Sequence, residues 1–313
     1  MAEILYKNGS TEIRLGQFHS IEKQGLPFFQ TNEFINRRID SNTIFFNLYE
    51  AGKPLTSIAF EIIDDQAISL PRSPFGGLIH LEEPNEEQIN KLLDTIITHF
   101  SAMQCDVLVR QCSDILYQYI PNVKEIFVRS GFKTEIIELN QHIIVDQELF
   151  RNKINRNRRR KIEACVQANF KFQKLDTSQL ADAYKLIKEC REDKGYPVTM
   201  SLQELMDVFE KFPNHYLLFG IMNGGELIAT GISIRVNSRI LYNFYHGDLL
   251  AYRDQSPVSL LVKGIYQYCQ VHGYSILDLG ISSDQSVLNE GLYAFKKSLG
   301  AQNSGKISYK YKN

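Results

Sequence analysis

The sequence predicts a mixed α/β fold made of two similar units in tandem, each a mixed sheet flanked by helices. The main observation is that one order of elements can be read twice along the chain: three strands, then helix, strand, helix and strand. The second observation is size and composition. The 313 residues, of which 43% are hydrophobic and 23% charged, are sufficient for two buried cores.

The first unit opens with a hairpin signal. Residues 42–63 hold two β-branched and aromatic stretches on either side of Ala51-Gly52-Lys53. Residues 86–100 repeat isoleucine and leucine at helical spacing, which predicts an amphipathic helix. In chain order we expect two strands within 42–63, a strand at 67–71, a helix at 86–100, a strand at 105–110, a helix at 122–130 and a strand at 132–139.

The second unit repeats this order after two extra helices. Asn223-Gly224-Gly225 is a strong turn signal between two strands. Ser256 and Pro257 supply a hydroxyl N-cap and a proline at the first helical position. In chain order we expect helices at 180–190 and 202–212, strands at 215–222, 226–236 and 239–246, a helix from 257 to about 272, a strand at 276–279, a helix at 289–298 and a strand at 306–312.

The two units align by feature rather than by residue identity. Gly52 corresponds to Gly224 and Gly131 to Gly300, with an offset of about 170 residues. A strongly basic stretch, residues 146–165, lies between them. We therefore place the boundary near Asp146 and expect an N-terminal domain at 1–145 and a C-terminal domain at 146–313.

Charge and cysteine content restrict the class of protein. The formal net charge is -1, so bulk attraction to DNA is not expected. No apolar run approaches the roughly 18 residues that span a bilayer, and the first residues do not resemble a signal peptide, so we expect a cytoplasmic protein without a membrane span. The five cysteines, at positions 105, 112, 165, 190 and 269, are scattered, which predicts reduced, mostly buried thiols and neither a disulfide nor a metal site.

Several motifs occur in the order expected for one family. Asp278-Leu279-Gly280 ends a strand, and residues 289–300 read Asn-x-Gly-Leu followed by Phe-Lys and Gly. Ser73-Pro74-Phe75-Gly76-Gly77 forms a loop in the first unit, and a basic helix at 156–167 opens the second. Together these features resemble the GNAT acetyltransferase fold, and two such units in one chain resemble the FemAB/FemX transferases. The resemblance covers nearly the whole chain.

The resemblance implies an N-acyltransferase that moves an acyl group to the amine of a small-molecule acceptor, such as a cell-envelope or polysaccharide precursor. Ordinary GNAT enzymes take acyl-CoA as donor, whereas Fem-type proteins take aminoacyl-tRNA. The sequence lacks both the long helical hairpin with which some Fem proteins grip tRNA and the glycine-spaced pyrophosphate loop of ordinary acetyltransferases. We favour acyl-CoA as the donor, with charged tRNA as the alternative, and expect no metal cofactor.

Three residues are candidates for catalysis in the second unit. Lys296 occupies the place where the resemblance implies a lysine, and a cation there could hold the developing oxyanion; the alternative is a cation that favours the helix dipole. Asp278 or His246 could accept a proton, although the aspartate could instead cap the loop that follows, and a lone histidine is more often structural. The corresponding place in the first unit is Phe127, which can neither donate a proton nor carry charge.

The remaining candidates bind rather than react. The start of the helix at Pro257 offers free N–H groups to a donor phosphate. The cluster of arginines at 156–160 could bind phosphates of CoA or tRNA. Alternatively, these arginines could belong to a solvated interdomain helix. The glycine loop of the first unit could shape the acceptor site or be a simple turn. The candidate donor-binding residues are Tyr245, Arg253, Ser256, Asn289 and Phe295. The candidate substrate-binding residues are Arg72, Ser73, Phe75, Gly76, Arg158, Arg159 and Lys297.

Two hypotheses from other classes compete with catalysis. In the first, both units are degenerate and the protein is a noncatalytic binding or scaffold component of envelope or polysaccharide assembly. In the second, the arginine cluster binds RNA, although no aromatic residues are interleaved with these arginines. The acceptor, the acyl group and the oligomeric state are not specified by the sequence.

Overall fold

The structure, a computed structural model, describes residues 3–16, 25–38, 43–111 and 122–313. The chain forms two compact units. Unit 1 consists of Met1–Leu139, Asp284–Val287 and Ser304–Asn313, and unit 2 consists of Asn140–Ser283 and Leu288–Asn303. The division of function between residues 1–145 and 146–313 stays a prediction. Cys112 lies outside the described residues, while the other four cysteines are free and buried.

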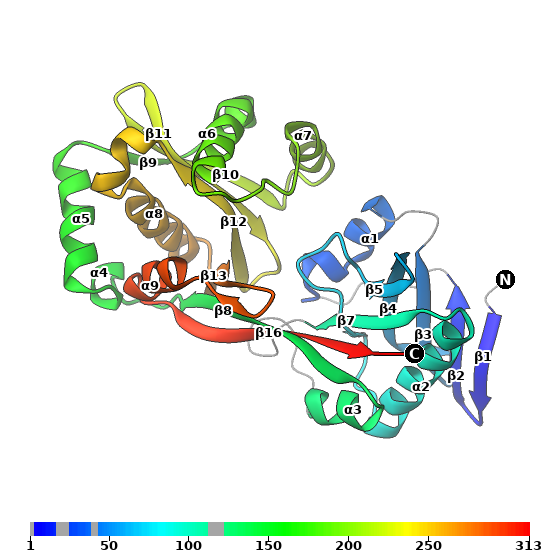
Figure 1. Ribbon diagram of the computed structural model, residues 1–313. Helices are drawn as coiled ribbons and strands as arrows, with labels where there is room; N and C mark the ends of the chain where they lie inside the picture. Colours follow the sequence, from blue (N-terminus) through cyan, green and yellow to red (C-terminus); the bar gives the residue numbers. More distant parts are fainter. Residues whose placement is uncertain (1–2, 17–24, 39–42, 112–121) are drawn as a thin grey trace. The chain divides into compact units, whose positions relative to one another are not determined.

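Unit 1 is a mixed sheet with helices, as predicted (Figure 1). Helix α2 begins with a capping box, in which Asn85 and Gln88 each accept a hydrogen bond from the other's backbone N–H. The elements are β1 (Glu3–Asn8), β2 (Thr11–Gly16), η1 (Phe28–Gln30), α1 (Asn32–Arg38), β3 (Ile44–Glu50), β4 (Lys53–Ile63), β5 (Gln66–Ser69), β6 (Ile79–His80), α2 (Glu86–Ala102), β7 (Asp106–Gln111) and α3 (Val123–Arg129).

The sheet of unit 1 has the strand order β1-β2-β3-β4-β5-β7-β16, with β6 paired to β4. The β3–β4 hairpin turns at Ala51 and Gly52, as the sequence predicts, and both residues have positive φ. Strands β5 and β7 run parallel, which requires the crossover that α2 provides. The core lies between this sheet and α2, where Leu92, Leu93 and Ile96 are fully buried.

Unit 2 contains the second set of elements, and the mixed α/β class is confirmed here as well. These elements are α4 (Phe150–Lys153), α5 (Arg156–Gln167), β9 (Lys171–Lys174), η2 (Thr177–Gln179), α6 (Leu180–Asp193), α7 (Leu202–Lys211), β10 (Tyr216–Asn223), β11 (Glu226–Arg235), β12 (Ile240–Asp248), η3 (Leu250–Gln255), α8 (Pro257–Val271), β13 (Ile276–Ile281) and α9 (Glu290–Ser298). Four strands have residues in both units: β8 (Lys133–Ile144), β14 (Ser283–Asp284), β15 (Val287–Leu288) and β16 (Gln302–Tyr311).

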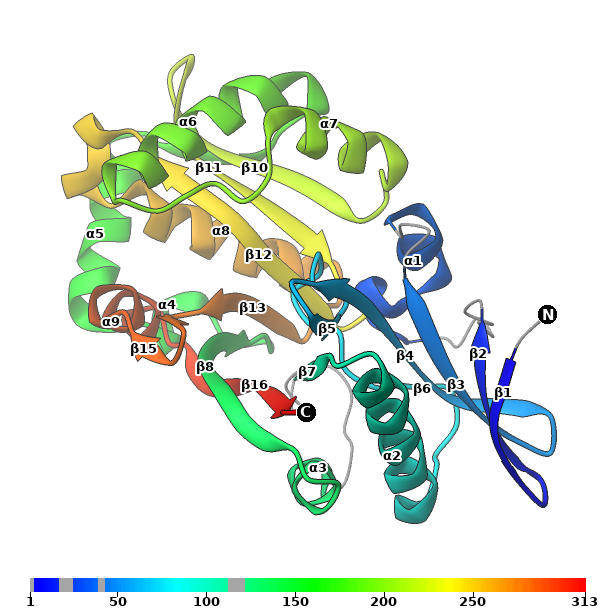
Figure 2. The ribbon, with the colours of Figure 1, turned by 45° about the vertical axis from the view of Figure 1, so that its right-hand side comes forward.

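Helices cover both faces of the unit 2 sheet, whose strand order is β8-β13-β12-β11-β10-β9. Figures 1 and 2 show α6 and α7 on one face and α8 on the other. The α8 face carries the main core, with Leu261, Ile265 and Tyr266 fully buried. No helix in the described ranges is both long and apolar enough to cross a membrane.

Strands β12 and β13 run parallel only briefly. They pair from Ile240 and Ile276 to Tyr242 and Asp278, and no pair joins them beyond that point. Strand β12 nevertheless continues to Asp248 and β13 to Ile281. The sheet therefore opens between these two strand ends. Figure 2 shows the two strands diverging.

Candidate active site

Lys296 lies at the open end of β13. Its side chain is 3% exposed, and Nζ donates hydrogen bonds to the carbonyl oxygens of Gly280 at 2.9 Å and Ile281 at 2.7 Å. Helix α9 positions the lysine, and Asn289 caps that helix by accepting the Leu292 N–H at 2.9 Å. Although Lys296 lies in the last turn of α9, its ammonium group binds carbonyls of another element. The interpretation as a cation that merely favours the helix dipole is therefore incomplete.

Asp278 fixes the strand end that Lys296 contacts. The residue is fully buried, and its Oδ1 accepts hydrogen bonds from Asn140 Nδ2 and from the backbone N–H of Gly280, both at 2.9 Å. Gly280 has φ of 75°, and a Cβ there would lie 3.2 Å from the Tyr242 ring. The carboxylate caps the loop that follows β13 through the Gly280 N–H, in keeping with the loop cap considered from the sequence. This contact holds the carbonyls that face Lys296.

His246 lies on β12, on the other side of the opening. Burial, followed by the positive charges of Lys296, Lys194 and Arg191, lowers its pKa from an ordinary 6.5 to about 3. The imidazole is therefore neutral at neutral pH, with Nδ1 3.3 Å from Asn243 Nδ2. A neutral imidazole can accept a proton, and its basicity would rise whenever an anion offset the three cations.

The lowered pKa of His246 predicts an acid-sensitive fold. The unfolded chain would bind a proton below about pH 6.5 and the folded chain only near pH 3, so stability is expected to fall as the pH drops through this window. At about pH 5 the loss from this residue should be on the order of 2 kcal/mol. Urea unfolding of wild type and His246→Gln at pH 7.5 and pH 5 checks this. Wild type and His246→Gln both keep His99 and His142, whose pKa values are also lowered by burial. If both proteins lost the same unfolding free energy between pH 7.5 and pH 5, the loss would not come from His246 and the prediction would be contradicted.

Asn243 is a residue that the sequence did not single out. It lies on β12 just beyond the last β12–β13 pair and is 3% exposed. Its Oδ1 is buried and has no hydrogen-bond partner among the described residues. A buried amide oxygen of this kind is costly unless something donates to it. The available signal was an asparagine inside an aromatic strand, Tyr242 to Tyr245.

A second polar group surrounds Arg158 at the start of α8. Its Nη1 donates to the hydroxyls of Ser256 at 2.9 Å and Ser259 at 3.0 Å, and Nε donates to Ser298 Oγ at 3.0 Å. The guanidinium also lies 4.8 Å from the centre of the Phe295 ring. Helix α9 therefore contributes to both sites, because Phe295 and Ser298 flank Lys296 in sequence. Ser259 and Ser298 were not predicted, although Ser259 follows Ser256 by one helical turn.

The hydroxyl cap predicted for Ser256 is wrong. The residue does precede α8, but its φ is 63°, and its side chain caps no backbone N–H. Its hydroxyl instead accepts a hydrogen bond from Arg158. Burial lowers the pKa of the Arg158 guanidinium, which still stays positive at neutral pH. Among the described residues no carboxylate pairs with Arg158, so neutral hydroxyls alone hold this charge and a phosphate would complement it.

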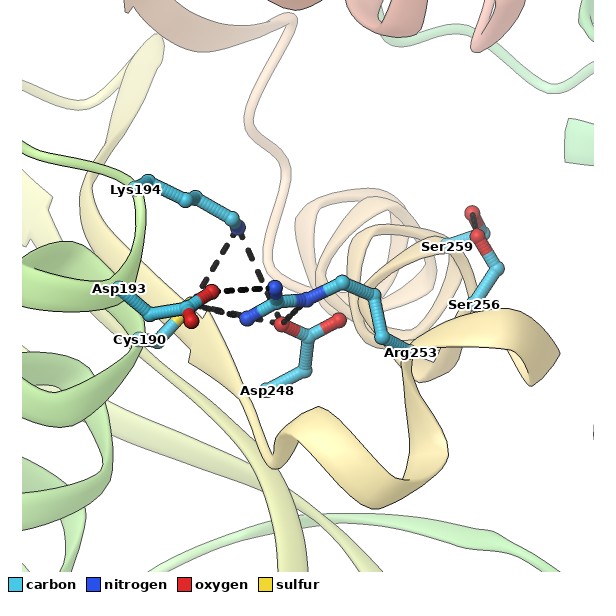
Figure 3. Close-up of polar contacts among 7 residues, drawn as sticks. All are labelled: Cys190, Asp193, Lys194, Asp248, Arg253, Ser256 and Ser259. Atoms are coloured by element: carbon cyan, nitrogen blue, oxygen red, sulfur yellow. Dashed lines mark hydrogen bonds and ion pairs between the residues drawn. The ribbon is translucent and has the colours of Figure 1, made fainter.

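Arg253, a predicted donor-binding residue, is held by carboxylates. Its Nη1 lies 2.6 Å from Asp193 Oδ2, its Nε lies 3.5 Å from Asp248 Oδ1, and the first of these bonds raises its pKa. Lys194 Nζ is 3.9 Å from the same Asp248 oxygen and 3.3 Å from Cys190 Sγ. Figure 3 shows Arg253 pointing toward this group. Its contacts link η3 to the end of α6 and so hold in place the segment that leads into α8.

Two other predicted donor-binding residues make structural contacts. The Tyr245 side chain is 3% exposed, and its hydroxyl accepts the Thr199 N–H at 3.1 Å and also pairs with the Thr199 hydroxyl. Asn289 caps α9, and its Nδ2 donates to the Tyr196 hydroxyl. Both side chains thereby secure the segment between α6 and α7.

The glycine loop of unit 1 is closely packed. The Ser73 hydroxyl donates to a backbone carbonyl of its own loop at 3.0 Å, and Phe75 is 1% exposed. A Cβ on Gly76 would come within 2.3 Å of the Ser69 carbonyl oxygen, so only glycine fits there. These contacts are those of a closely packed turn, and a role of the loop in acceptor binding stays a prediction. Arg72 is exposed, with its Nε 3.6 Å from Glu61 Oε2.

The last two predicted substrate-binding residues are Lys297 and Arg159. Lys297 is exposed, and its Nζ lies 5.5 Å from the centre of the Tyr293 ring. Arg159 lines a groove between α4, α5 and α8 that is considered below. Within the described ranges, no group of three or more histidine, cysteine, aspartate or glutamate side chains is arranged to hold a metal ion.

Comparison with known proteins identifies a domain family and the fold. Residues 149–297 match the acetyltransferase (GNAT) domain family. No curated protein matches the chain. Among solved structures, FemX is 14% identical, with a TM-score of 0.68 over 91% of this chain and 92% of that one.

Two further structures share the arrangement. L-PGS from Bacillus licheniformis is 11% identical, with a TM-score of 0.58 over 87% of this chain and 84% of that one. A tandem GNAT protein from the clavulanic acid biosynthesis pathway is 10% identical, with a TM-score of 0.55 over 88% and 84%. Likeness at this level of identity concerns the fold. Residues 149–297 therefore carry a GNAT acetyltransferase domain, and the chain as a whole has a tandem GNAT, FemX-like fold.

Proposed function

We propose that the protein is an N-acyltransferase that moves an acyl group from a thioester donor to an amine acceptor at unit 2. The match to a GNAT domain supports an acyl- or aminoacyltransferase in general. The observation that carries the proposal is the opening between β12 and β13, where the Gly280 and Ile281 carbonyls hold the buried ammonium of Lys296 and its charge acts on His246 across the opening. A positive group preorganised in a site of low polarity is suited to stabilise an oxyanion.

The reaction follows from these groups. The neutral amine attacks the thioester carbonyl carbon, a C–N bond forms and the carbonyl oxygen becomes negative. Lys296 stabilises that charge, and its collapse breaks the C–S bond. One amine proton is transferred to His246, and the departing thiolate is protonated in turn. Burial and, after it, three nearby positive charges lower the pKa of His246. As negative charge develops near Lys296, it offsets the contribution of those charges, so the histidine becomes more basic when it is needed.

Asp278 acts on this site through the backbone. Its carboxylate is fully buried and already accepts two hydrogen bonds. Of the two proton acceptors predicted from the sequence, His246 is therefore favoured, because its side chain is only partly buried whereas Asp278 is fully buried. Asp278 is better described as a positioning residue that holds the Gly280 and Ile281 carbonyls against Lys296.

The start of α8 is the proposed seat of the donor phosphate. Arg158 brings an unbalanced positive charge to the helix N-terminus, where backbone N–H groups also attract anions. The unpartnered Oδ1 of Asn243 is suited to accept an amide N–H of the donor arm. These features support acyl-CoA as the donor. An aminoacyl-tRNA, whose phosphates have the same charge, is the alternative.

Donor binding tests the proposal directly. Purified protein is titrated with acetyl-CoA, longer acyl-CoAs and a charged-tRNA mixture, using calorimetry and filter retention. We expect an acyl-CoA to bind, and Arg158→Ala to weaken binding by about 10-fold or more because a charged hydrogen-bonding group is lost. Arg160→Ala, an exposed neighbour on the same helix, is the matched control. Retention of tRNA alone would indicate an aminoacyltransferase, and binding of neither would favour a noncatalytic scaffold.

A further inference from the structure

A groove of about 440 Å³ lies between α4, α5 and α8, outside the site described above. Its surface is largely apolar, and two of its side chains, Leu149 and Val166, are 63% and 52% exposed. The apolar lining residues are Leu149, Phe150, Ile154, Ile162 and Val166. Exposed apolar side chains around a concave surface mark a place where another molecule docks.

The same groove carries positive charge. Arg151, Arg159 and Lys263 line it, against a single acidic lining residue, Glu163. In the part of the chain that the structure describes, none of the three cations forms an ion pair, and the buried Arg159 Nε has no hydrogen-bond partner. The groove therefore complements an amphipathic helix that has an apolar ridge and acidic flanks.

The groove adjoins the donor site. Arg158 and Arg159 are consecutive on α5: the first binds the serines at the start of α8, and the second lines the groove. Lys263, on α8 itself, lies two turns beyond Ser256 and also lines the groove. A molecule seated in the groove would consequently lie close to the phosphate of the donor.

We propose that the acyl donor is presented by an acidic carrier protein, whose helix docks in this groove and whose phosphopantetheine arm carries the acyl thioester. This inference rests on the proposed function. The arm's single phosphodiester matches the one guanidinium and three hydroxyls of the Arg158 site. In the transfer, the acceptor amine forms the C–N bond, the C–S bond breaks, and the arm is released as a free thiol that takes up the proton.

Two other anionic partners fit the groove less well. RNA recognition relies on aromatic side chains that stack with bases, and the one aromatic residue of the groove, Phe150, is 3% exposed. A lipid surface is bound by apolar side chains that project from a protein, whereas this surface is concave. A concave apolar floor with a cationic rim favours an acidic helix of a protein partner.

The test measures binding of a purified acidic acyl carrier protein, in its holo and acylated forms, by calorimetry at low and at moderate salt. We expect binding that weakens as salt rises, and a Kd at least 10-fold higher for Arg151→Glu/Lys263→Glu. The control Lys171→Glu/Lys185→Glu reverses two exposed cations of unit 2 outside the groove and should bind normally. A second variant, Leu149→Ser/Val166→Ser, should weaken binding without changing charge.

Acyl-CoA titrations of the same proteins separate the two proposals. The inference is supported if the groove variants lose binding of the carrier protein but bind acyl-CoA with the affinity of wild type. If the wild-type protein binds acyl-CoA but does not bind the carrier protein, the inference is overturned and the proposed function is retained. Binding of neither donor overturns both. If the groove variants instead lose affinity for tRNA or for vesicles of anionic phospholipid, and carrier protein is not bound, the groove serves that other partner and the inference fails.

Discussion

Lys296→Ala is expected to lower kcat by about 10²- to 10³-fold, because it removes the group that faces the developing oxyanion. The affinity for the donor should change little, since Arg158 at the proposed phosphate seat is held by Ser256, Ser298 and the Phe295 ring, none of which the substitution removes. The measurement is release of free thiol from the donor in the presence of a panel of amines. Circular dichroism checks folding, because the substitution also leaves the Gly280 and Ile281 carbonyls without their donor.

Lys297→Ala is the matched control for this substitution. Lys297 is the next residue on α9 and carries the same charge. Its side chain is exposed and contacts Tyr293. We expect its kcat to stay within about 2-fold of wild type, as is usual for an exposed substitution away from a site. Equal losses for both lysines would assign the effect to the net charge of the helix. A Lys296→Ala protein with the kcat of wild type would contradict the proposal that Lys296 stabilises the oxyanion.

Asp278→Ala is expected to lower the free energy of unfolding of the protein by about 3 kcal/mol. The fully buried carboxylate accepts hydrogen bonds from Asn140 Nδ2 and the Gly280 N–H, and its removal leaves both donors buried without that acceptor. Urea unfolding followed by circular dichroism measures the change. A loss below about 1 kcal/mol would show that neither bond contributes as the structure indicates.

Asp278→Asn separates positioning from proton transfer. The amide keeps a side-chain oxygen that can accept the Gly280 N–H, so the loss of stability should be smaller than for alanine. If Asp278 only positions the strand end, this variant keeps most of its kcat and an unchanged pH profile. A loss of 100-fold or more in a stable Asp278→Asn protein would instead make the aspartate the proton acceptor and would leave His246 without that role.

The two units differ at the position of the lysine. The first-unit residue that the alignment places there, Phe127, is fully buried, and its ring stacks on Tyr309 with the ring centres 4.3 Å apart. This position belongs to the core of unit 1 and provides neither a charge nor a proton. That any chemistry takes place in unit 2 stays a prediction.

Much of the architecture was determined by the sequence alone. The turn at Asn223-Gly224-Gly225, the start of α8 at Pro257 and the bounds of α5 all depend on local propensity and periodicity, which are written in consecutive residues. The β1–β2 hairpin and α1 were missed. Strand β1 lies at the edge of the sheet, and most of its residues are exposed, so it lacks the alternation that marks a half-buried strand.

The composition of the site was decided only by the tertiary structure. The sequence proposed Lys296, Asp278, His246 and Arg158 separately, but their partners come from residues far along the chain: Asn140 for the aspartate and Ser298 for the arginine. The same folding placed Arg253 against Asp193 and buried Tyr245, contacts that residue type alone does not indicate. Residue type and spacing determine what a side chain can do, whereas charge balance, burial and hydrogen-bond partners exist only after distant segments meet.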